Sequence, residues 1–523
     1  MSNPVTTRRA LIAAAGAGLA APGFAAAPDT AHGLVRDAAT GAGIAGVMVS
    51  NGEAVVLTDA AGRWTLDLAV GDSAFVIKPA GWMTEVTAET MLPRFAYPYV
   101  PGGSSAALDL RYPGVAPTGK LPASIDFVLR RQAEATRFDV VLYTDPQPET
   151  LAEIGYIRDD VVARSIGIKA AFGITLGDVM FDDLSFYDRY NKIIGSIGLP
   201  WYNCPGNHDI NYEAPSDALS RETFKRVFGA RYHAFFHAGA VFFALDNVEY
   251  LGADPARRGG KGHYRGNFGT RQLSFIRNVL QHVAPDTLVV CCFHVPLKTL
   301  VASGPGSTTI DTDAFLAAIA SHQTSVSFSG HTHTNEHWYL GAHHHHVLSA
   351  ASGSWWSGPF DARGIPVAIQ SDGAPNGLHL LSIDGNRYST TLVPAHDPAI
   401  DQIRLGVDSQ GHHRGAIGRA ALASSFIMAN LFDGGPRSTL EIAIGAGKFV
   451  AMQKTERIDP YIVDLYARNP DTKKRWVQPG KSSHLWQARL PGELGVGSHA
   501  VQVRGRDEFG RAHAAAMVLE VVE

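Results

Sequence analysis

The sequence predicts a layered α/β (α+β) core that lies between a small β-sandwich before it and a second β-sandwich after it. Strand-like and helix-like runs alternate between about residues 137 and 396, which is typical of layered α/β or α+β folds. Short strand-like runs separated by turn residues fill the stretches on either side. At about 100–200 residues per domain, a chain of 523 residues has room for three such units.

Composition excludes several classes of protein. The chain is 45% hydrophobic, which is ample for several cores and excludes wholesale disorder. Its 45 Lys and Arg nearly balance 49 Asp and Glu, for a formal net charge of −4, so it lacks the basic excess of a typical nucleic-acid binder. Only Cys204, Cys291 and Cys292 are present, and so few cysteines do not form a disulfide framework.

Residues 1–27 are predicted to be an export signal. Arg8 and Arg9 precede a weakly apolar run rich in Ala and Gly that reaches about Ala21, and Phe24-Ala25-Ala26-Ala27 offers small residues to a signal peptidase. This pattern resembles a twin-arginine signal, and the alternative is an apolar, disordered N-terminus. We therefore expect a periplasmic or secreted protein that meets the twin-arginine export machinery and has no transmembrane segment.

The N-terminal β-sandwich and its linker are expected over residues 30–122. Asn51-Gly52 separates the strand-like runs 47–49 and 55–58, a strong hairpin signal. Trp64, Leu66 and Leu68 then alternate with polar residues as in a half-buried strand. The stretch 98–122 is rich in Pro, Gly and Ser and is interpreted as a linker or as a loop packed on a neighbour.

The central domain is expected over residues 136–400 and the C-terminal β-sandwich over 401–523. Two helical faces are predicted in the centre, one over residues 184–197 and the other over 273–283. The C-terminal part shows five strand-like runs between Gly-rich and Pro-rich turns. These runs cover residues 425–428, 439–444, 461–466, 499–503 and 517–521.

Five strand-like runs of the central domain each end in residues that can bind a metal ion. The residues that follow them are Asp145 and Gln147, Asp178, Asn207, His294, and His331 with His333. Ligands gather outside the carboxyl ends of strands in layered α/β sheets, so we expect these side chains to form one cluster. Each motif alone is weak evidence for a metal site, because a single His or Gly-Asp pair more often has a structural role. The five motifs in this order are specific for such a site.

The ordered motifs Gly177-Asp178, Gly206-Asn207-His208-Asp209, His294 and Gly330-His331-Thr332-His333 resemble those of the calcineurin-like metallophosphoesterases. With its flanking β regions, the chain resembles the bacterial subgroup that carries N-terminal and C-terminal β-sandwich extensions. Two further segments are similar to the C-terminal region of that subgroup, which would then begin near residue 350. They are Gly353-Ser354-Trp355-Trp356-Ser357-Gly358 and Asp372-Gly373-Ala374-Pro375-Asn376-Gly377.

The resemblance implies a four-layer core of two packed sheets flanked by helices, with two adjacent divalent metal ions. The first ion would be held by Asp145, Gln147, Asp178 and His333. The second would be held by Asp178, Asn207, His294 and His331, with Asp178 bridging. All these donors are N or O, which favours Mn, Fe or Zn of undetermined identity. The family usually has His at the position of Gln147, whose neutral amide is a weaker ligand, so the first ion is expected to be bound more loosely or to be a harder cation.

The implied activity is hydrolysis of phosphate esters, with phosphodiesters favoured. A hydroxide held between the metals would attack phosphorus, His208 would act as general acid, and Asp209 would orient its ring. The alternatives are a phosphomonoesterase or pyrophosphatase of the same fold, and a non-catalytic glycan-binding envelope protein with a vestigial core. The sequence does not determine the natural substrate or the oligomeric state.

Five further residues are candidates for substrate contacts: Tyr264, Arg265, Trp355, Trp356 and Asp361. The two tryptophans would stack on an organic leaving group or pack between domains. The run His343 to His346 would either add a metal or substrate contact or consist of strand residues near the site. Cys291 and Cys292 are expected on opposite faces of one strand, as buried thiols.

Overall fold

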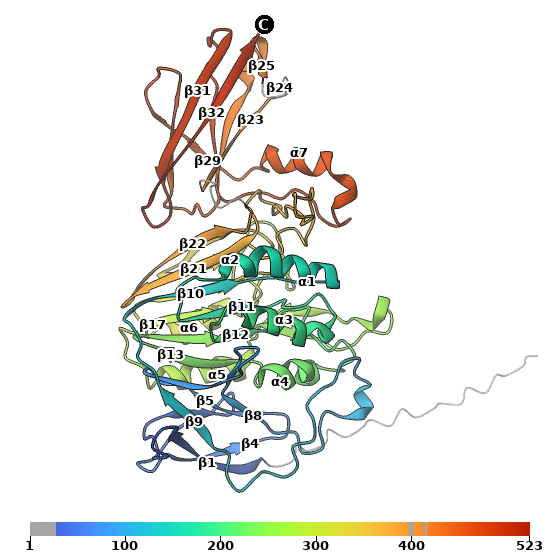
Figure 1. The fold of residues 1–523 in the computed structure, drawn as a ribbon, viewed down its shortest axis with the longest axis vertical. Helices are drawn as coiled ribbons and strands as arrows, with labels where there is room; N and C mark the ends of the chain where they lie inside the picture. The colour runs from blue at the N-terminus through green and yellow to red at the C-terminus, as the bar shows by residue number, and fades with distance from the viewer. Residues whose placement is uncertain (1–27, 397–401, 410–411, 414–415) are drawn as a thin grey trace, which may run out of the picture.

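A computed structural model describes residues 28–396, 402–409, 412–413 and 416–523, so the predicted export signal lies outside the described residues. Three groups of sheets follow one another along the long axis of the molecule, with the N-terminal and C-terminal sheets at opposite ends of the central ones (Figure 1). Within the described ranges, every helix is too short or too polar to cross a bilayer.

Two sheets form the centre. The first has the strand order β12-β11-β10-β21-β22, with β10, β11 and β12 parallel. The second has the order β13-β14-β17-β18-β20-β19, with β14, β17, β18 and β20 parallel. Their bounds are β10 (Arg137–Tyr143), β11 (Phe172–Leu176), β12 (Trp201–Cys204), β13 (His233–His237), β14 (Ala240–Ala244), β17 (Leu288–Cys292), β18 (Ser325–Ser329), β19 (Glu336–Leu340), β20 (His343–Val347), β21 (Gly377–Asp384) and β22 (Arg387–Pro394).

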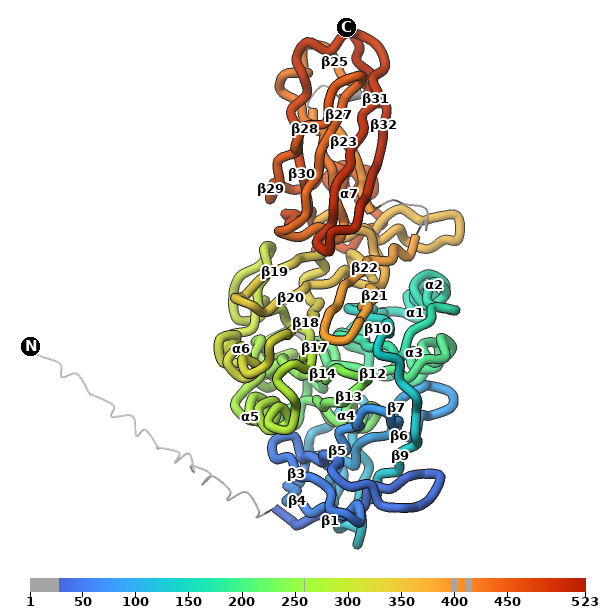
Figure 2. Tube along the Cα trace, turned by 90° about the vertical axis from the view of Figure 1, so that its left-hand side faces the viewer, coloured from blue at the N-terminus to red at the C-terminus, as the bar shows by residue number. Residues whose placement is uncertain are grey.

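Helices cover the outer faces of both sheets, which gives the four layers that the sequence predicts (Figure 2). Residues such as Val140 and Val290 fill the space between the sheets. The outer face of the first sheet packs on one helical layer and that of the second sheet on another. The first layer holds α1 (Leu151–Ile157), the π-helical η2 (Arg158–Val162), α2 (Ala163–Ser165), η3 (Leu184–Phe186), α3 (Tyr187–Gly195) and α4 (Glu222–Phe228), and the second holds α5 (Gly269–Leu280) and α6 (Thr312–Ile319).

The expected cysteine arrangement is confirmed. Cys291 lies in the core beneath α5 and α6, and Cys292 lies in the core between the two sheets. Both thiols are buried and free. β15 (Val248–Tyr250) and β16 (Tyr264–Gly266) form a short separate ribbon; η4 (Asp217–Leu219) precedes it in the chain, and η5 (Arg258–Gly260) lies between its two strands.

The N-terminal residues form sheets of order β4-β1-β9-β6-β7 and β3-β2-β5-β8. The predicted hairpin at Asn51-Gly52 is confirmed by the antiparallel pairing of β2 with β3. The stretch 98–122 packs on the core, because Tyr112 is buried there and donates to the Asp182 carbonyl at 3.1 Å. The bounds are β1 (Asp29–Asp37), β2 (Met48–Ser50), β3 (Val55–Leu57), β4 (Arg63–Leu68), β5 (Ser73–Ile77), β6 (Trp82–Val86), β7 (Pro93–Arg94), β8 (Ala96–Pro98), η1 (Ala106–Leu108) and β9 (Phe127–Arg131).

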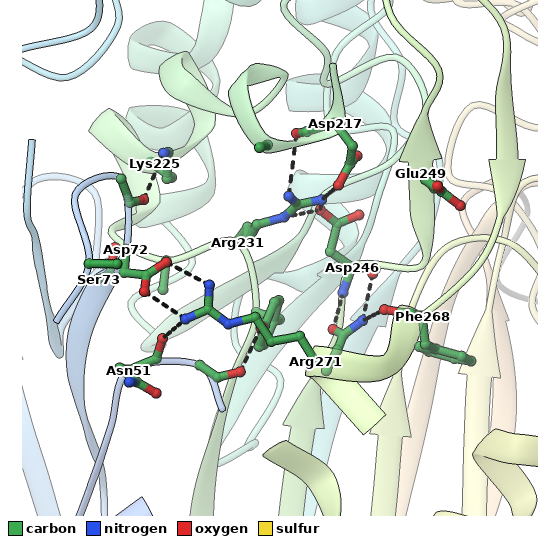
Figure 3. Close-up of a pocket in the computed structure, with 18 of the residues that line it drawn as sticks. Asn51, Asp72, Ser73, Asp217, Lys225, Arg231, Asp246, Glu249, Phe268 and Arg271 are labelled. Carbon is green, nitrogen blue, oxygen red and sulfur yellow. Dashed lines mark hydrogen bonds and ion pairs between the residues drawn. The ribbon is translucent and has the colours of Figure 1, made fainter. Parts of the chain in front are cut away.

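A pocket between the N-terminal sheets and the core is lined in part by ion-paired residues (Figure 3). Arg231 contacts Asp217 and Asp246, each at 2.8 Å. Arg271 reaches Asp72 of the N-terminal part at 2.6 Å. None of the predicted metal ligands lines this pocket. The pair of Arg271 and Asp72 therefore joins the two parts, and the pocket is not the candidate site, because it contains none of the predicted ligands.

The C-terminal residues form sheets of order β23-β26-β30-β29 and β24-β25-β32-β31-β27-β28 that share one core. Four of the five strand-like runs predicted there overlap strands. The bounds are β23 (Ile403–Asp408), β24 (His412–His413), β25 (Ala416–Gly418), η6 (Arg419–Ser424), β26 (Phe426–Leu431), β27 (Thr439–Ile444), β28 (Val450–Ala451), β29 (Gln453–Thr455), α7 (Pro460–Arg468), η7 (Pro470–Thr472), β30 (Leu485–Arg489), β31 (Gly497–Arg506) and β32 (Ala512–Val522).

The strand predicted over residues 461–466 is wrong, because this run lies in the helix α7. The Asp459 side chain accepts the Tyr461 backbone N–H at the N-cap, and Pro460 occupies the first turn, both strong helix-start signals. Ile462, Leu465 and Tyr466 are buried at helical spacing. The aromatic and β-branched composition suggested a strand, but the cap and the packing determine a helix.

A buried ion pair between Lys78 and Glu134 should hold the N-terminal part on the core. Lys78 Nζ lies 2.8 Å from Glu134 Oε1 and also donates to the Phe236 carbonyl, and both side chains are buried. Removing one partner of such a pair costs about 3–5 kcal/mol, so Glu134→Ala should lower the free energy of unfolding by that amount in urea. Glu441→Ala removes the exposed pair with Arg504 and should have a much smaller effect. Equal decreases in the free energy of unfolding of the two variants would contradict the role given to the pair of Lys78 and Glu134.

Candidate metal centre

All seven predicted ligands lie just beyond the carboxyl ends of parallel strands of the two central sheets, where ligands gather in such folds. β10 is followed by Asp145 and Gln147, β11 by Asp178, β12 by Asn207, β17 by His294, and β18 by His331 and His333. The burial of all five strands fixes where each chain leaves its sheet. The fold therefore brings together residues that are up to 188 positions apart in the sequence (145 to 333).

Five of these ligands have left-handed backbones. Their φ angles are 47° at Asp145, 38° at Gln147, 49° at Asp178, 74° at His331 and 53° at His333. A non-glycine residue in this region is uncommon and strained by of order 1–3 kcal/mol, and such residues cluster at functional sites. After β10, β11 and β18, these left-handed residues turn the chain immediately beyond the strand and direct the side chains inward.

Glycines beside the ligands allow the close approach of neighbouring loops. A Cβ at Gly206 would lie 2.1 Å from Asp178 Oδ1, and a Cβ at Gly330 would lie 2.1 Å from Asp145 Oδ2. Any side chain at these positions would displace a ligand carboxylate. These glycines of the motifs therefore set the spacing of the cluster.

The carboxylate of Asp178 lies at the centre of the cluster. Its Oδ1 accepts the backbone N–H of His208 at 2.8 Å. Its Oδ2 contacts His294 Nε2 at 3.1 Å and accepts a hydrogen bond from Gln147 Nε2. His294 Nε2 also lies 3.1 Å from Asn207 Oδ1 and 3.2 Å from His331 Nδ1.

Asp145 and His333 complete the cluster on its other side. Asp145 accepts the backbone N–H of His331 at 3.0 Å, and His333 Nε2 lies 3.6 Å from Asp145 Oδ1. Trp355 stacks on the His333 ring, with centroids 3.8 Å apart.

Each of the three ligand histidines uses one nitrogen to hold its orientation. His294 Nδ1 donates to the Leu176 carbonyl at 3.0 Å, His331 Nε2 donates to the Gly306 carbonyl at 2.9 Å, and His333 Nδ1 donates to the Gly353 carbonyl. The other nitrogen of each ring therefore faces the cluster. Metal-ligating histidines are oriented in this way in proteins.

The cluster fits divalent cations. One ligand atom each from Asp178, His294 and His331 lie within 4.8 Å of one another. Gln147 Oε1 and His333 Nε2 are buried and have no hydrogen-bond partner among the described residues, although buried polar atoms are nearly always paired. Both atoms belong to the ligand set that the sequence predicts for the first metal, so a cation in this place would satisfy them.

The pKa shifts of two ligand histidines also fit a site for a cation. Although burial opposes it, the charge of Asp178 raises the pKa of His294 to about 9. Burial and the charge of His294 lower the pKa of His331 to about 3. The proton on His294 partly neutralises the buried carboxylates, and a cation bound here would compete for that same charge.

The predicted contact between Asp209 and the His208 ring is wrong. His208 Nδ1 donates instead to Asp182 Oδ1 at 2.7 Å. Asp182 is also bound by Lys261 and by Tyr212 Oη, the latter at 2.8 Å. Although burial opposes it, the hydrogen bond and charge of His208 hold the pKa of Asp182 at about 2. The sequence motif places Asp209 next to His208, but the loop turns its side chain away.

Asp209 holds the loops instead. Its buried carboxylate accepts the backbone N–H groups of Val179, Met180 and Gly206 at 2.8–3.3 Å and the Tyr187 hydroxyl at 2.8 Å. Burial and the charge of Asp178 raise its pKa. Asp209 thus fixes the Asp178 loop and the Asn207 loop to each other.

The candidate substrate residues divide into two groups. Tyr264 and Trp355 lie at the cluster, since the Tyr264 ring meets the His331 ring edge-on at 6.1 Å and Trp355 stacks on His333. The other three are engaged by protein groups. Arg265 pairs with Glu249 at 2.6 Å, Asp361 pairs with Arg363 at 2.8 Å, and Trp356 is buried and donates to the Pro146 carbonyl at 3.0 Å.

The sequence analysis did not predict a pair of aromatic side chains, Phe181 and Trp476, that lie beside His208 and are called the aromatic wall below. The Phe181 ring stacks on the His208 ring at 4.5 Å and on the Trp476 ring at 6.1 Å. Trp476 comes from the C-terminal part and is 52% exposed. Phe181 lies three residues after a predicted ligand, which is a weak signal, and the sequence gives no signal for Trp476.

The layered core with N and O donors at its strand ends is the arrangement that the motif resemblance implies. Two family models of calcineurin-like phosphoesterases match the chain, which confirms its resemblance to this family. The family model described as the N terminal of calcineurin-like phosphoesterase matches residues 29–112, and the one described as the C terminal of calcineurin-like phosphoesterase matches residues 345–513. The family implies divalent metal ions and phosphoester substrates.

Solved structures similar to this chain include phosphatases. A dimetal phosphatase from Danio rerio is 14% identical, and the match covers 49% of this chain and 98% of that one with a TM-score of 0.32. Purple acid phosphatase PPD1 from yellow lupin is 12% identical over 68% of each chain with a TM-score of 0.35. GAP50 of Plasmodium is 12% identical over 50% of this chain and 86% of that one with a TM-score of 0.32. No curated protein matches the chain.

From their contacts, we expect replacement of Asp209 by Asn to destabilise the protein more than replacement of Asp182 by Asn. Asp209→Asn places an amide among backbone N–H donors and should lower the free energy of unfolding by about 1.5–3 kcal/mol, the value of a hydrogen bond to a charged group. Asp182→Asn keeps an acceptor for His208 and should be less destabilising. Urea unfolding of both variants measures this. A larger loss in Asp182→Asn would contradict the structural role given to Asp209.

Proposed function

We propose that the chain is a phosphoester hydrolase with a binuclear metal centre, in which His208 is the general acid and Asp182 positions it. The observation that carries the proposal is the convergence of seven N and O donors from five strand ends, with His208 at their margin. Asp178 Oδ1 and Oδ2 face different neighbours, so this carboxylate is suited to bridge two cations. Divalent ions bound here would lower the pKa of a water molecule and neutralise charge on the phosphoryl group.

The assignment of His208 is supported by its surroundings. Its side chain is 22% exposed, so a substrate can reach it, whereas the metal ligands His294 and His333 are fully buried. Nδ1 is held by Asp182, which leaves Nε2 to give a proton to the leaving oxygen. Although partial burial opposes it, the charges of Asp178 and Asp182 raise the pKa of His208, which favours the protonated form that an acid needs.

The substrate is proposed to be a phosphate ester with an organic leaving group, and phosphodiesters are favoured. Support comes from the aromatic wall of Phe181 and Trp476, on which a base, a sugar or an aromatic group could stack beside the acid. Turnover of bis(p-nitrophenyl) phosphate against p-nitrophenyl phosphate separates a diesterase from a monoesterase. Absence of turnover in the metal-loaded protein would instead favour a non-catalytic glycan-binding role.

Asp178→Asn should lower the metal content of both positions, because it removes a charge and the bridging donor. The matched control is Asp183→Asn, since the Asp183 side chain caps the short helix η3 and is not one of the predicted ligands. Metal content measured by inductively coupled plasma mass spectrometry should fall in the first variant and stay at the wild-type value in the second. Normal metal stoichiometry and activity in Asp178→Asn would refute the binuclear centre.

His208→Ala should reduce turnover in proportion to how much the leaving oxygen needs a proton. General acid catalysis contributes about 10²–10⁴-fold, so the loss should reach that range for an alkyl phosphodiester and be much smaller for a nitrophenyl one. Asp182→Asn should show the same bias more weakly, and Asp209→Asn should not show it. If His208 only supports the Asn207 loop, both substrates should lose equally and metal should be lost too.

We further propose that the protein is exported by the twin-arginine route, on the basis of Arg8 and Arg9 in the sequence. Replacing both by Lys should retain the protein in the cytoplasm, as measured by fractionation of the native host. The matched control is Lys120→Arg with Lys169→Arg, which makes two conservative exchanges in the folded part. Normal export of the Arg8→Lys, Arg9→Lys protein would contradict this route.

A further inference from the structure

The run of four histidines on β20 presents two different faces. His343 and His345 face one side, where their rings lie 2.7–2.8 Å from the hydroxyls of Ser325 and Ser327 of β18. His344 and His346 face the other side, as strand alternation requires. His337 of β19 pairs directly opposite His346, so it joins this second face.

These three imidazoles, His337, His344 and His346, each offer one nitrogen to a common point. The three atoms lie within 4.8 Å of one another, and His337 Nδ1 is 3.2 Å from His344 Nε2. His346 is fully buried, and neither of its ring nitrogens has a partner among the described residues. A neutral imidazole always carries one N–H donor, so His346 is incompletely satisfied by protein atoms alone.

The outer nitrogens of the other two rings are already held. His337 Nε2 lies 3.0 Å from Asp433 Oδ1, and His344 Nδ1 lies 2.6 Å from Tyr388 Oη. Carboxylates and other acceptors orient metal-ligating histidines in this way. Burial and the neighbouring imidazoles lower the pKa of His344 to about 2 and that of His346 well below its usual value. Both rings are therefore in the neutral form that binds metals.

We propose that His337, His344 and His346 form a further metal site, suited to a divalent transition metal such as Zn²⁺. Three imidazoles with an open fourth position are an established zinc-binding set. The site shares no residue with the Asp178 cluster and does not depend on the proposed phosphoesterase activity. Asp433 and Phe509, whose ring stacks on His346 at 6.3 Å, belong to the C-terminal part. A metal bound here would therefore stabilise the contact between the central and C-terminal sheets.

The direct test uses the full-length wild-type protein, stripped with a chelator and crystallised with excess ZnCl₂. Anomalous maps from data collected on either side of the zinc absorption edge should show a peak about 2.0–2.1 Å from one nitrogen of each ring. The absence of a peak there, in crystals whose Asp178 cluster holds zinc, would overturn the proposal. A peak there without one at the Asp178 cluster would support this site and count against the other.

Matched variants test the same point in solution. His346→Gln should bind one zinc equivalent fewer than the wild type, whereas His343→Gln, on the opposite face of the same strand, should keep the full number. Asp433→Asn should weaken zinc binding by about 10–100-fold. Equal zinc loss in His346→Gln and His343→Gln would assign the effect to damage of the strand and overturn the proposal. If His346→Gln does not fold, the diffraction test on the wild type still decides.

Discussion

The buried charge of Asp178 is the constraint on which the central site depends. An ionised carboxylate inside a protein is costly unless it is paired and hydrogen-bonded. Oδ1 is satisfied by a backbone N–H from the loop after β12, and Oδ2 by side chains that follow β10 and β17. One carboxylate therefore ties four strand ends together, and the loop that carries it has little freedom to move without losing all these contacts.

The rest of the site follows from how the strands end. Buried parallel strands fix the exit points, and left-handed residues turn the chain inward at Asp145, Asp178 and His331. That backbone strain is maintained because the layers above and below are closely packed. Asp209 then connects two of the turns through backbone N–H groups. The positions of the donor atoms are therefore fixed by the packed strand ends together with the contacts of Asp178 and Asp209.

The sequence predicted the layered core and the convergence of the seven candidate ligands, because both depend on local patterns of buried strands followed by donor residues. It was insufficient where a contact depends on the path of a loop. Asp182 is four residues from Asp178, and only the folded loop reveals that it, and not Asp209, reaches His208. The helix α7 was not predicted, because its aromatic and β-branched residues suggested a strand and the Asp459 cap was overlooked. The contact of Trp476 with Phe181 was not predicted, because almost 300 residues separate the two in the sequence.

The stack of His208, Phe181 and Trp476 has a consequence for the evolution of such enzymes. One of its rings belongs to the C-terminal part of the chain, although the ligands of the Asp178 cluster all belong to the central part. Under the proposed function, exchange of the C-terminal part between relatives, by recombination, would change the surface beside His208 and leave the ligands of the Asp178 cluster intact. The range of esters could then diverge faster than the reaction itself.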